Sequence, residues 1–189
     1  KAECDICVTS SNVYDIAEKI DSNHIYFLPD KLMGKNLENE LKRRNCNKTI
    51  KYWDGTCYVH EEYEPEMIDY VRLKHPNIKV VSHPECPPEV VEKTDYVGST
   101  SQMINYVKDT NADSFFMLTE CGLTSRLQTE MPEKIFKGTC TMCKYMKSNS
   151  LTSILATLKN PGENQMIHIN SNTQQRALNC LNNMFKYAE

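Results

Sequence analysis

The sequence predicts an α/β protein in which short parallel strands alternate with amphipathic helices. Two local patterns indicate this fold class. Apolar runs of strand length occupy residues 24–28 (HIYFL), 78–81 (IKVV) and 114–118 (SFFML). Apolar side chains recur at helical spacing in two sets, Val13, Ile16, Ala17 and Ile20, and Met67, Ile68 and Val71. We therefore expect buried strands at the three runs and helices over the two periodic stretches.

An internal repeat supports the same fold class. Asp5–Asn12 can be laid on Asp95–Gln102, and the same offset of 90 residues places the run 24–28 on the run 114–118. Self-similarity at a fixed offset indicates that one structural unit is repeated. We expect pseudo-symmetric units of three-layer α/β/α structure, with parallel sheets and right-handed crossovers.

The repeat also predicts where ligands bind. Asp30 and Glu120 fall at matching positions after their strands, and each copy continues into a Gly-Thr-Cys segment, at 55–57 and at 138–140. Ligands of parallel α/β units collect at the carboxyl ends of the strands. If the copies surround an axis, equivalent cysteines would meet there.

The C-terminal part has no counterpart in the other copy. Thr173 opens a predicted helix with an apolar face formed by Ala177, Leu178, Leu181, Met184 and Phe185. We expect this helix to pack against another part of the protein.

Composition excludes several classes of protein. The 189 residues carry a formal net charge of −3 with scattered cations, unlike the basic footprint of a nucleic-acid binder. No apolar run reaches the ~18–20 residues of a transmembrane helix, and the N-terminus lacks the design of a signal peptide. The chain starts at Lys1 rather than Met, so we expect a fragment or a processed product. Localisation is predicted to be cytoplasmic.

Cysteine is unusually frequent, with nine residues. An odd number without a secretion signal argues against a disulfide framework and for a reducing compartment. Most of the nine are read as small buried apolar side chains. Cys57 and the pair Cys140/Cys143 could instead ligate zinc or iron–sulfur, because both accept thiolates. A four-cysteine zinc site that adds Cys4 and Cys7 is disfavoured, because zinc-binding pairs normally lie closer in sequence.

Three further segments carry candidate binding chemistry. Thr9–Ser11 and Ser99–Ser101 each stand between an expected short strand and a helix, so they suit either a bound phosphate or carboxylate or an ordinary helix cap. His83 and Glu85 follow the apolar run 78–81 and could bind a substrate anion and move protons, or could be solvated loop residues. His60, three residues beyond Cys57, is open to the same roles.

Taken together these segments resemble the quinolinate synthase family over essentially all 189 residues. The resemblance is carried by DICVTSSN, FLPDKLMG, WDGTCYVHEEY, VVSHPECP, TDYVGSTSQM, CTMCKYMKSNSL and RALNCLNNM. It implies three α/β domains in pseudo-threefold arrangement, of which this chain holds two: residues 1–57 and 58–143, with 144–189 packing on a first domain that the chain lacks.

The resemblance also implies a reaction and a cofactor. Iminoaspartate and dihydroxyacetone phosphate condense to quinolinate, with loss of phosphate and water, at a [4Fe–4S] cluster held by one cysteine from each domain. Cys57 and Cys143 match two of these ligands, and Cys140 resembles an additional cysteine of some members. An aspartate-oxidising enzyme is implied as the supplier of iminoaspartate. Lacking the third ligand, the chain alone is expected to be inactive.

Residue by residue, the resemblance places Glu85 at the general-base position and His60 at an active-site histidine. It places Ser10, His83, Ser99 and Thr100 where the family holds substrate carboxylates or phosphate. Two other readings remain: an α/β protein that binds a phosphosugar or nucleotide without a cluster, and a non-catalytic module stabilised by zinc. Iron and sulfide analysis separates the three.

Overall fold

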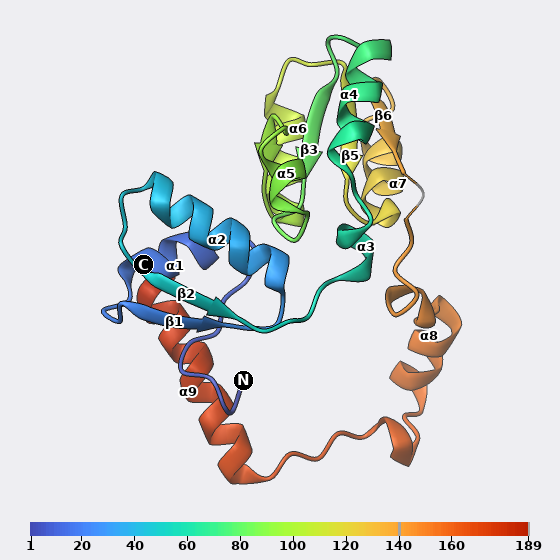
Figure 1. Cartoon of the computed structure of the whole chain (residues 1–189). Helices are drawn as coiled ribbons and strands as arrows, with labels where there is room; N and C mark the ends of the chain where they lie inside the picture. Colours follow the sequence, from blue (N-terminus) through green and yellow to red (C-terminus); the bar gives the residue numbers. More distant parts are fainter. Residues whose placement is uncertain (140, 189) are drawn as a thin grey trace. The chain divides into compact units, whose positions relative to one another are not determined.

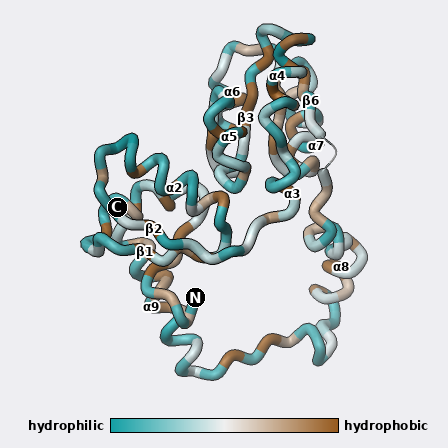
Figure 2. Tube along the Cα trace, in the orientation of Figure 1, coloured by the Kyte–Doolittle hydropathy of each residue, from teal (hydrophilic) through white to brown (hydrophobic). Residues whose placement is uncertain are grey.

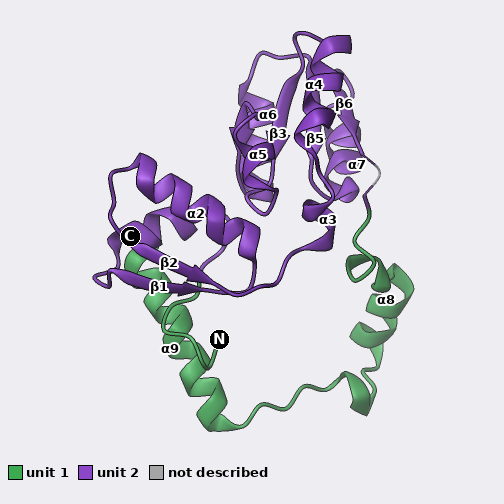
Figure 3. Ribbon diagram, viewed as in Figure 1, with its two compact units in different colours: residues 1–7, 142–189 green, residues 8–141 purple. Residues whose placement is uncertain are grey.

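The computed structural model describes residues 1–139 and 141–188. The chain divides into two compact units (Figure 3). Unit 1 comprises Lys1–Cys7 and Met142–Glu189, and unit 2 comprises Val8–Thr141. Each unit is described by itself below.

Unit 2 begins with the first copy of the repeat (Figure 1). Its elements in chain order are α1 (Val13–Lys19), β1 (His24–Phe27), α2 (Lys31–Arg43) and β2 (Thr49–Tyr52). The two strands are parallel, in a register that runs from His24 opposite Thr49 to Phe27 opposite Tyr52. Their core is formed by Val13, Ala17, Phe27, Met33, Leu37, Leu41 and Ile50. Both helices therefore bury their apolar faces with the sheet.

Two short helices then lead into the second copy. The elements in chain order are α3 (Tyr58–Glu61), α4 (Pro65–Lys74), β3 (Lys79–Ser82), α5 (Pro88–Val91), β4 (Tyr96–Val97), α6 (Thr100–Asp109), β5 (Ser114–Leu118), α7 (Cys121–Glu130) and β6 (Ile135–Gly138). The four strands are all parallel, in the order β4-β3-β5-β6.

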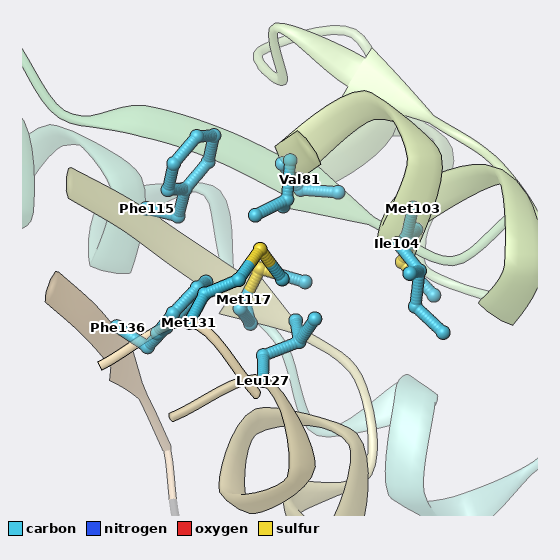
Figure 4. Close-up of a cluster of buried hydrophobic side chains, with 9 residues drawn as sticks. Val81, Met103, Ile104, Phe115, Met117, Leu127, Met131 and Phe136 are labelled. Carbon is cyan, nitrogen blue, oxygen red and sulfur yellow. The ribbon is translucent and has the colours of Figure 1, made fainter. Parts of the chain in front are cut away.

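The four-stranded sheet is covered on both faces. Val81, Phe115 and Met117 pack on one side with residues of α6 and α7 (Figure 4). Val80, Phe116 and Leu118 pack on the other side with residues that precede β3 or lie in α5. Successive residues of β5 alternate between the two cores because side chains of a strand point to opposite faces. The predicted α/β/α class with parallel sheets is confirmed.

The apolar runs were the reliable strand signal. All three predicted strands form, as β1, β3 and β5, and the predicted helices form as α1 and α4. The expectation that all three strands are buried is wrong for β1, which buries one of its four residues. The strands β2 and β6 also bury one residue each, and their sequences contain no apolar run. The strand expected before Thr9 is absent, because the first strand among the described residues begins at His24.

Helix α2 shows how the sequence fixes both ends of an element. Asp30 begins it by accepting the Met33 N–H at 2.7 Å. At the other end Asn45 adopts a φ of 57°, in the left-handed region that asparagine tolerates. The Cys46 N–H then donates to the Leu41 carbonyl at 2.9 Å and the Asn45 N–H to that of Lys42 at 3.1 Å. This pair of bonds is the Schellman arrangement that ends helices.

The two copies use the same hydrogen bonds at their helix starts. The Thr9 N–H donates to Asn12 Oδ1 at 2.7 Å, and the Ser99 N–H donates to Gln102 Oε1 at 2.8 Å. Both pairs obey the offset of 90. The offset continues to the next helix of each copy, since Asp30 caps α2 and Glu120 caps α7. The repeat therefore extends to individual backbone contacts.

The equivalence of the two Gly-Thr-Cys segments is wrong. In each copy the first strand pairs with the second so that Phe27 faces Tyr52 and Met117 faces Gly138. Tyr52 and Gly138 are thus equivalent, at an offset of 86. The helix α2 has three residues more than α7, and the loop that follows it has one more. Cys57 therefore matches position 143 and not position 140, which lies outside the described residues.

Unit 1 joins the N-terminal segment to the C-terminal helix. Its elements are η1 (Met146–Ser148), α8 (Leu151–Lys159), η2 (Glu163–Gln165) and α9 (Ser171–Ala188). The predicted final helix is confirmed as α9. Apolar colour marks α8 and the stretch after it (Figure 2), where Leu158 and Ile167 are largely exposed. The domain limits 1–57, 58–143 and 144–189 stay predictions.

Candidate functional site

Three predicted site residues meet in unit 2. His60, from α3, places Nδ1 at 2.9 Å from Glu85 Oε2. The His83 ring stacks on the His60 ring, with centroids 4.5 Å apart and planes 15° from parallel. His83 Nδ1 lies 3.6 Å from the same Glu85 oxygen. His60 is buried and the other two are half-buried. One carboxylate oxygen of Glu85 thus lies beside the Nδ1 atoms of both stacked imidazoles.

The backbone around Cys57 is tied to the turn after β1. The Cys57 N–H donates to Asp30 Oδ2 at 2.8 Å, while the other oxygen of Asp30 caps α2. The Lys31 N–H donates to the Gly55 carbonyl at 2.7 Å. A Cβ on Gly55 would lie 3.0 Å from the Pro29 carbonyl oxygen, so this approach favours glycine. The contacts of Asp30 and Gly55 together fix the position of the Cys57 backbone.

The segment with His83 and Glu85 leaves the carboxyl end of β3. The His83 N–H donates to the Leu118 carbonyl at 3.3 Å, which continues the pairing with β5 by one residue. Buried Asn36 of α2 donates to the carbonyls of Pro84 and Cys86, each at 2.8 Å. One amide of the first copy therefore holds the backbone on both sides of Glu85.

Two site residues were missed by the sequence analysis. The hydroxyl of Thr119 lies 3.2 Å from His60 Nε2, and Tyr63 donates its hydroxyl to the Thr119 carbonyl at 2.7 Å. Thr119 directly follows β5, so the rule that ligands collect at strand ends could have found it. Tyr63 follows α3, and no sequence pattern marks it.

Electrostatics favour an ion pair in this cluster. Burial, the largest influence on His60, lowers its pKa, but interactions with Cys57 and Glu85 outweigh burial and raise the pKa to about 9. For Glu85 burial is again the largest influence and raises the pKa, but His60 and His83 bring the net pKa below its ordinary value. Burial and then the His60 charge lower the pKa of His83 to about 4. The favoured state is His60⁺ and Glu85⁻ beside neutral His83.

The same cluster could hold a metal. Cys57, His60 and Glu85 offer ligand atoms that all lie within 4.8 Å of one another. Thiolate and imidazole are ligands for zinc and for iron, and thiolates are the usual ligands of iron–sulfur clusters. The donor set therefore fits a metal at Cys57.

The two Ser/Thr turns of unit 2 are joined. Ser99 caps α6, and Gln102 Nε2 donates to the Ser11 carbonyl at 3.3 Å. Ser99 is buried, Ser10 is half-buried and Thr100 is exposed. Gly98 precedes this turn, and its N–H donates to the Ser82 carbonyl at the end of β3 at 3.1 Å. The turns thus lie at the same sheet edge as His83, while their role as substrate contacts stays a prediction.

The second predicted metal ligand lies in the other unit. Cys143 precedes η1, and its carbonyl accepts the Lys147 N–H at 3.0 Å. Its proximity to Cys57 therefore stays a prediction.

Comparison with known proteins decides the family. The model of the family described as "Quinolinate synthetase A protein" matches residues 1–186. This chain belongs to that family. Quinolinate synthase of Clostridium novyi (strain NT) is 38% identical over 185 residues, which are 97% of the chain. The enzyme of Clostridioides difficile (strain 630) is 38% identical over 191 residues and covers 100% of the chain. The enzyme of Sinorhizobium fredii is 38% identical over 167 residues and covers 88% of the chain.

The chain spans only part of the length of the relatives that it matches. The chain spans 60% of the C. novyi enzyme, 61% of the C. difficile enzyme and 45% of the S. fredii enzyme. Among the described residues, no helix has both the length and the apolar character needed to cross a membrane.

Proposed function

We propose that this chain supplies two of the three α/β domains of a quinolinate synthase. The whole protein would condense iminoaspartate with dihydroxyacetone phosphate to give quinolinate, phosphate and water. Family membership supports this proposal, and the cluster of Cys57, His60 and Glu85 is the observation that carries it to particular residues. The divisions at 57/58 and 143/144 are proposed as the domain limits.

The proposed cofactor is a [4Fe–4S] cluster held by Cys57, by Cys143 and by a cysteine of the domain that this chain does not span. The matching of Cys57 with position 143 supports the choice of Cys143 over Cys140. Three thiolates leave one iron open, which supplies a Lewis acid for the dehydration steps. With two of the three thiolates, the chain alone is expected to be inactive.

Glu85 is the proposed general base. Glu85 is an ionised carboxylate at neutral pH, and this half-buried side chain can accept a proton from carbon or nitrogen during ring closure. His60 holds one oxygen of this carboxylate in place. His60 is itself held on its other ring nitrogen by Thr119, so the ring presents a fixed edge to Glu85.

Both substrates are anions, and the proposed contacts are suited to anions. Ser99 and Thr100 start a helix of ten residues, whose N-terminus favours negative charge. Ser10 belongs to the turn that Gln102 joins to this one. His83 lies at the same sheet edge and donates or accepts according to its tautomer. An aspartate-oxidising enzyme is the proposed source of iminoaspartate, because an α-imino acid is the product of such an oxidation.

The decisive experiment replaces Glu85 by Gln in the whole protein, purified without oxygen. Turnover should fall by ~10²–10⁴-fold while iron and sulfide stay at parental levels. Glu89→Gln is the matched control, since Glu89 is an exposed glutamate of α5, four residues further along. Activity within a few-fold of the parent would remove Glu85 from the proton transfers. A colourless protein without iron would support a cluster-free phosphosugar- or nucleotide-binding protein, and bound zinc would support a zinc-stabilised module.

A further inference from the structure

Three cysteines that the proposed function does not use come together in unit 1. The N-terminal segment Glu3–Cys7 runs along α9 and is held there at three points. Arg176 pairs with Glu3 at 2.7 Å, and Asn183 donates to the Asp5 carbonyl at 2.9 Å. Between these contacts the Cys7 N–H donates to the Cys180 carbonyl at 3.2 Å.

This backbone hydrogen bond limits the separation of the two cysteines. Standard bond lengths on either side of a 3.2 Å contact keep the Cα atoms of Cys7 and Cys180 within roughly 7 Å. Disulfides in proteins span Cα distances of about 4.4–6.8 Å. The N–H of Cys4 donates instead to the Lys1 carbonyl, within a turn of its own segment. Cys7 is therefore the better placed of the two to reach Cys180.

Burial singles out Cys180 on its helix. It is 1% exposed, and it is the buried residue of α9 in the described part of the chain. The other described side chains of α9 are exposed or half-buried, and the Cys7 N–H contacts the Cys180 carbonyl. Burial, followed by the charges of Cys7 and Cys4, raises the pKa of Cys180. All three thiols therefore lie close enough to affect one another.

We infer that Cys7 and Cys180 form a reversible disulfide that fastens the segment Glu3–Cys7 to α9. A metal site is the weaker reading of the three cysteines, since among the described residues their sulfur atoms do not form a group as close as that of Cys57, His60 and Glu85. The bond would close a loop over most of the chain.

The chemistry is thiol–disulfide exchange with a small-molecule disulfide such as oxidised glutathione. The Cys7 thiolate attacks one sulfur of the oxidant, and the first glutathione leaves as a thiolate. Cys180 then loses its proton to solvent and attacks the sulfur of Cys7, which expels the second glutathione. Two protein thiols are oxidised and one disulfide is reduced, so no other reagent is needed.

Peptide mapping of the full chain tests the assignment. The chain is equilibrated in mixtures of reduced and oxidised glutathione, alkylated, and digested after Lys and Arg. Cys4 and Cys7 share the peptide 2–19, and Cys180 lies in 177–186. We expect these two peptides to be joined in oxidising mixtures, with the alkyl group on Cys4, and to separate in reducing ones. The oxidised chain should also unfold at a higher temperature than the reduced chain.

Matched variants complete the test. Cys7→Ala should abolish the joined peptides and the redox dependence of the unfolding temperature, whereas Cys4→Ala and Cys46→Ala should keep both. A bridge between Cys4 and Cys7 that forms before any bond to Cys180 would overturn the inference. Full alkylation of Cys180 in every glutathione mixture would also overturn the inference. This result is measured on the unmutated chain, so misfolding of a variant cannot cause it.

Discussion

In the first copy of the repeat β1 and β2 form a sheet of two strands, whereas their counterparts β5 and β6 belong to a sheet of four that also contains β3 and β4. The two copies nevertheless share the hydrogen bonds that start their helices, at Thr9 and Ser99, and the acidic caps Asp30 and Glu120. The proposed proton-transfer residues do not follow this symmetry. His60 comes from the link between the copies and Glu85 from the end of β3. The repeat thus sets the backbone, and the chemistry lies where the copies differ.

The largest expected effect tests the matching of the copies at their cysteines. Cys57 and Cys143 are equivalent by strand register, so Cys143→Ala in the whole protein should reduce cluster iron and sulfide to background. Cys140→Ala is the matched control and should retain both. Metal and sulfide analysis after anaerobic purification measures the difference. A brown, active Cys143→Ala protein beside a colourless Cys140→Ala protein would reverse the assignment.

The second prediction compares the two cores. Phe115→Ala should lower the free energy of unfolding by about 3–5 kcal/mol, because the ring is fully buried and its removal leaves a cavity. Leu37→Ala, at an equally buried position of the first copy, should cost about 2–5 kcal/mol. Urea denaturation measures both. Leu73→Ala, at an exposed position of α4, should change stability by less than about 0.5 kcal/mol.

If the first copy depends on the second, both core variants should shift one common transition. A two-stranded sheet is marginal alone, so independent unfolding of the first copy is not expected. Separate transitions for the two copies would contradict this dependence.

The third prediction concerns the amide that bridges the copies. Asn36→Leu leaves the carbonyls of Pro84 and Cys86 without their buried donor, which should cost about 1–3 kcal/mol. Asn39→Leu on the same helix is the control, because Asn39 is only half-buried. Chemical denaturation of both variants gives the comparison. Equal losses would mean that the bridge does not join the copies energetically.

The smallest effects concern the helix starts. Asn12→Ala and Gln102→Ala each remove the side-chain acceptor of a backbone N–H and should cost about 1 kcal/mol. Gln102→Ala should cost the more, because it also loses the bond to the Ser11 carbonyl. Thermal unfolding of the two variants beside Ser101→Ala, an exposed position of α6, measures this. A larger loss of stability in Asn12→Ala than in Gln102→Ala would mean that the two helix starts are not energetically equivalent.

Much of the fold could be predicted from local patterns, because buried strands need continuous apolar runs. The strands β2 and β6 could not, since lysine interrupts both and leaves no apolar run, whereas β1 carries such a run although half of its residues are exposed. The repeat alone did not give the cysteine register, because its two Gly-Thr-Cys segments pair Cys57 with position 140. The resemblance to the family chose Cys143 instead, and the strand register agrees with that choice because α2 and the loop after it are longer than their counterparts.

The candidate site was also predictable only in part. His83 and Glu85 were chosen because they follow an apolar run, and His60 because it lies three residues beyond Cys57; the fold brings these three together. Thr119 and Tyr63 complete the cluster through a hydroxyl and a carbonyl. Such contacts between residues 56 to 59 positions apart depend on the tertiary structure and leave no spacing in the sequence.

Trp53 gives this protein a natural optical probe. It is the single tryptophan of the chain, it is half-exposed, and its indole contacts the position where Gly55 would carry a side chain. Its backbone N–H is bound to the Phe27 carbonyl, so the backbone of Trp53 is anchored at the end of β1, four residues before Cys57. Intrinsic fluorescence excited at the indole band therefore reports on one loop alone. Emission from that loop would dim when an absorbing metal centre assembles at Cys57, which permits assembly to be followed in real time without a label.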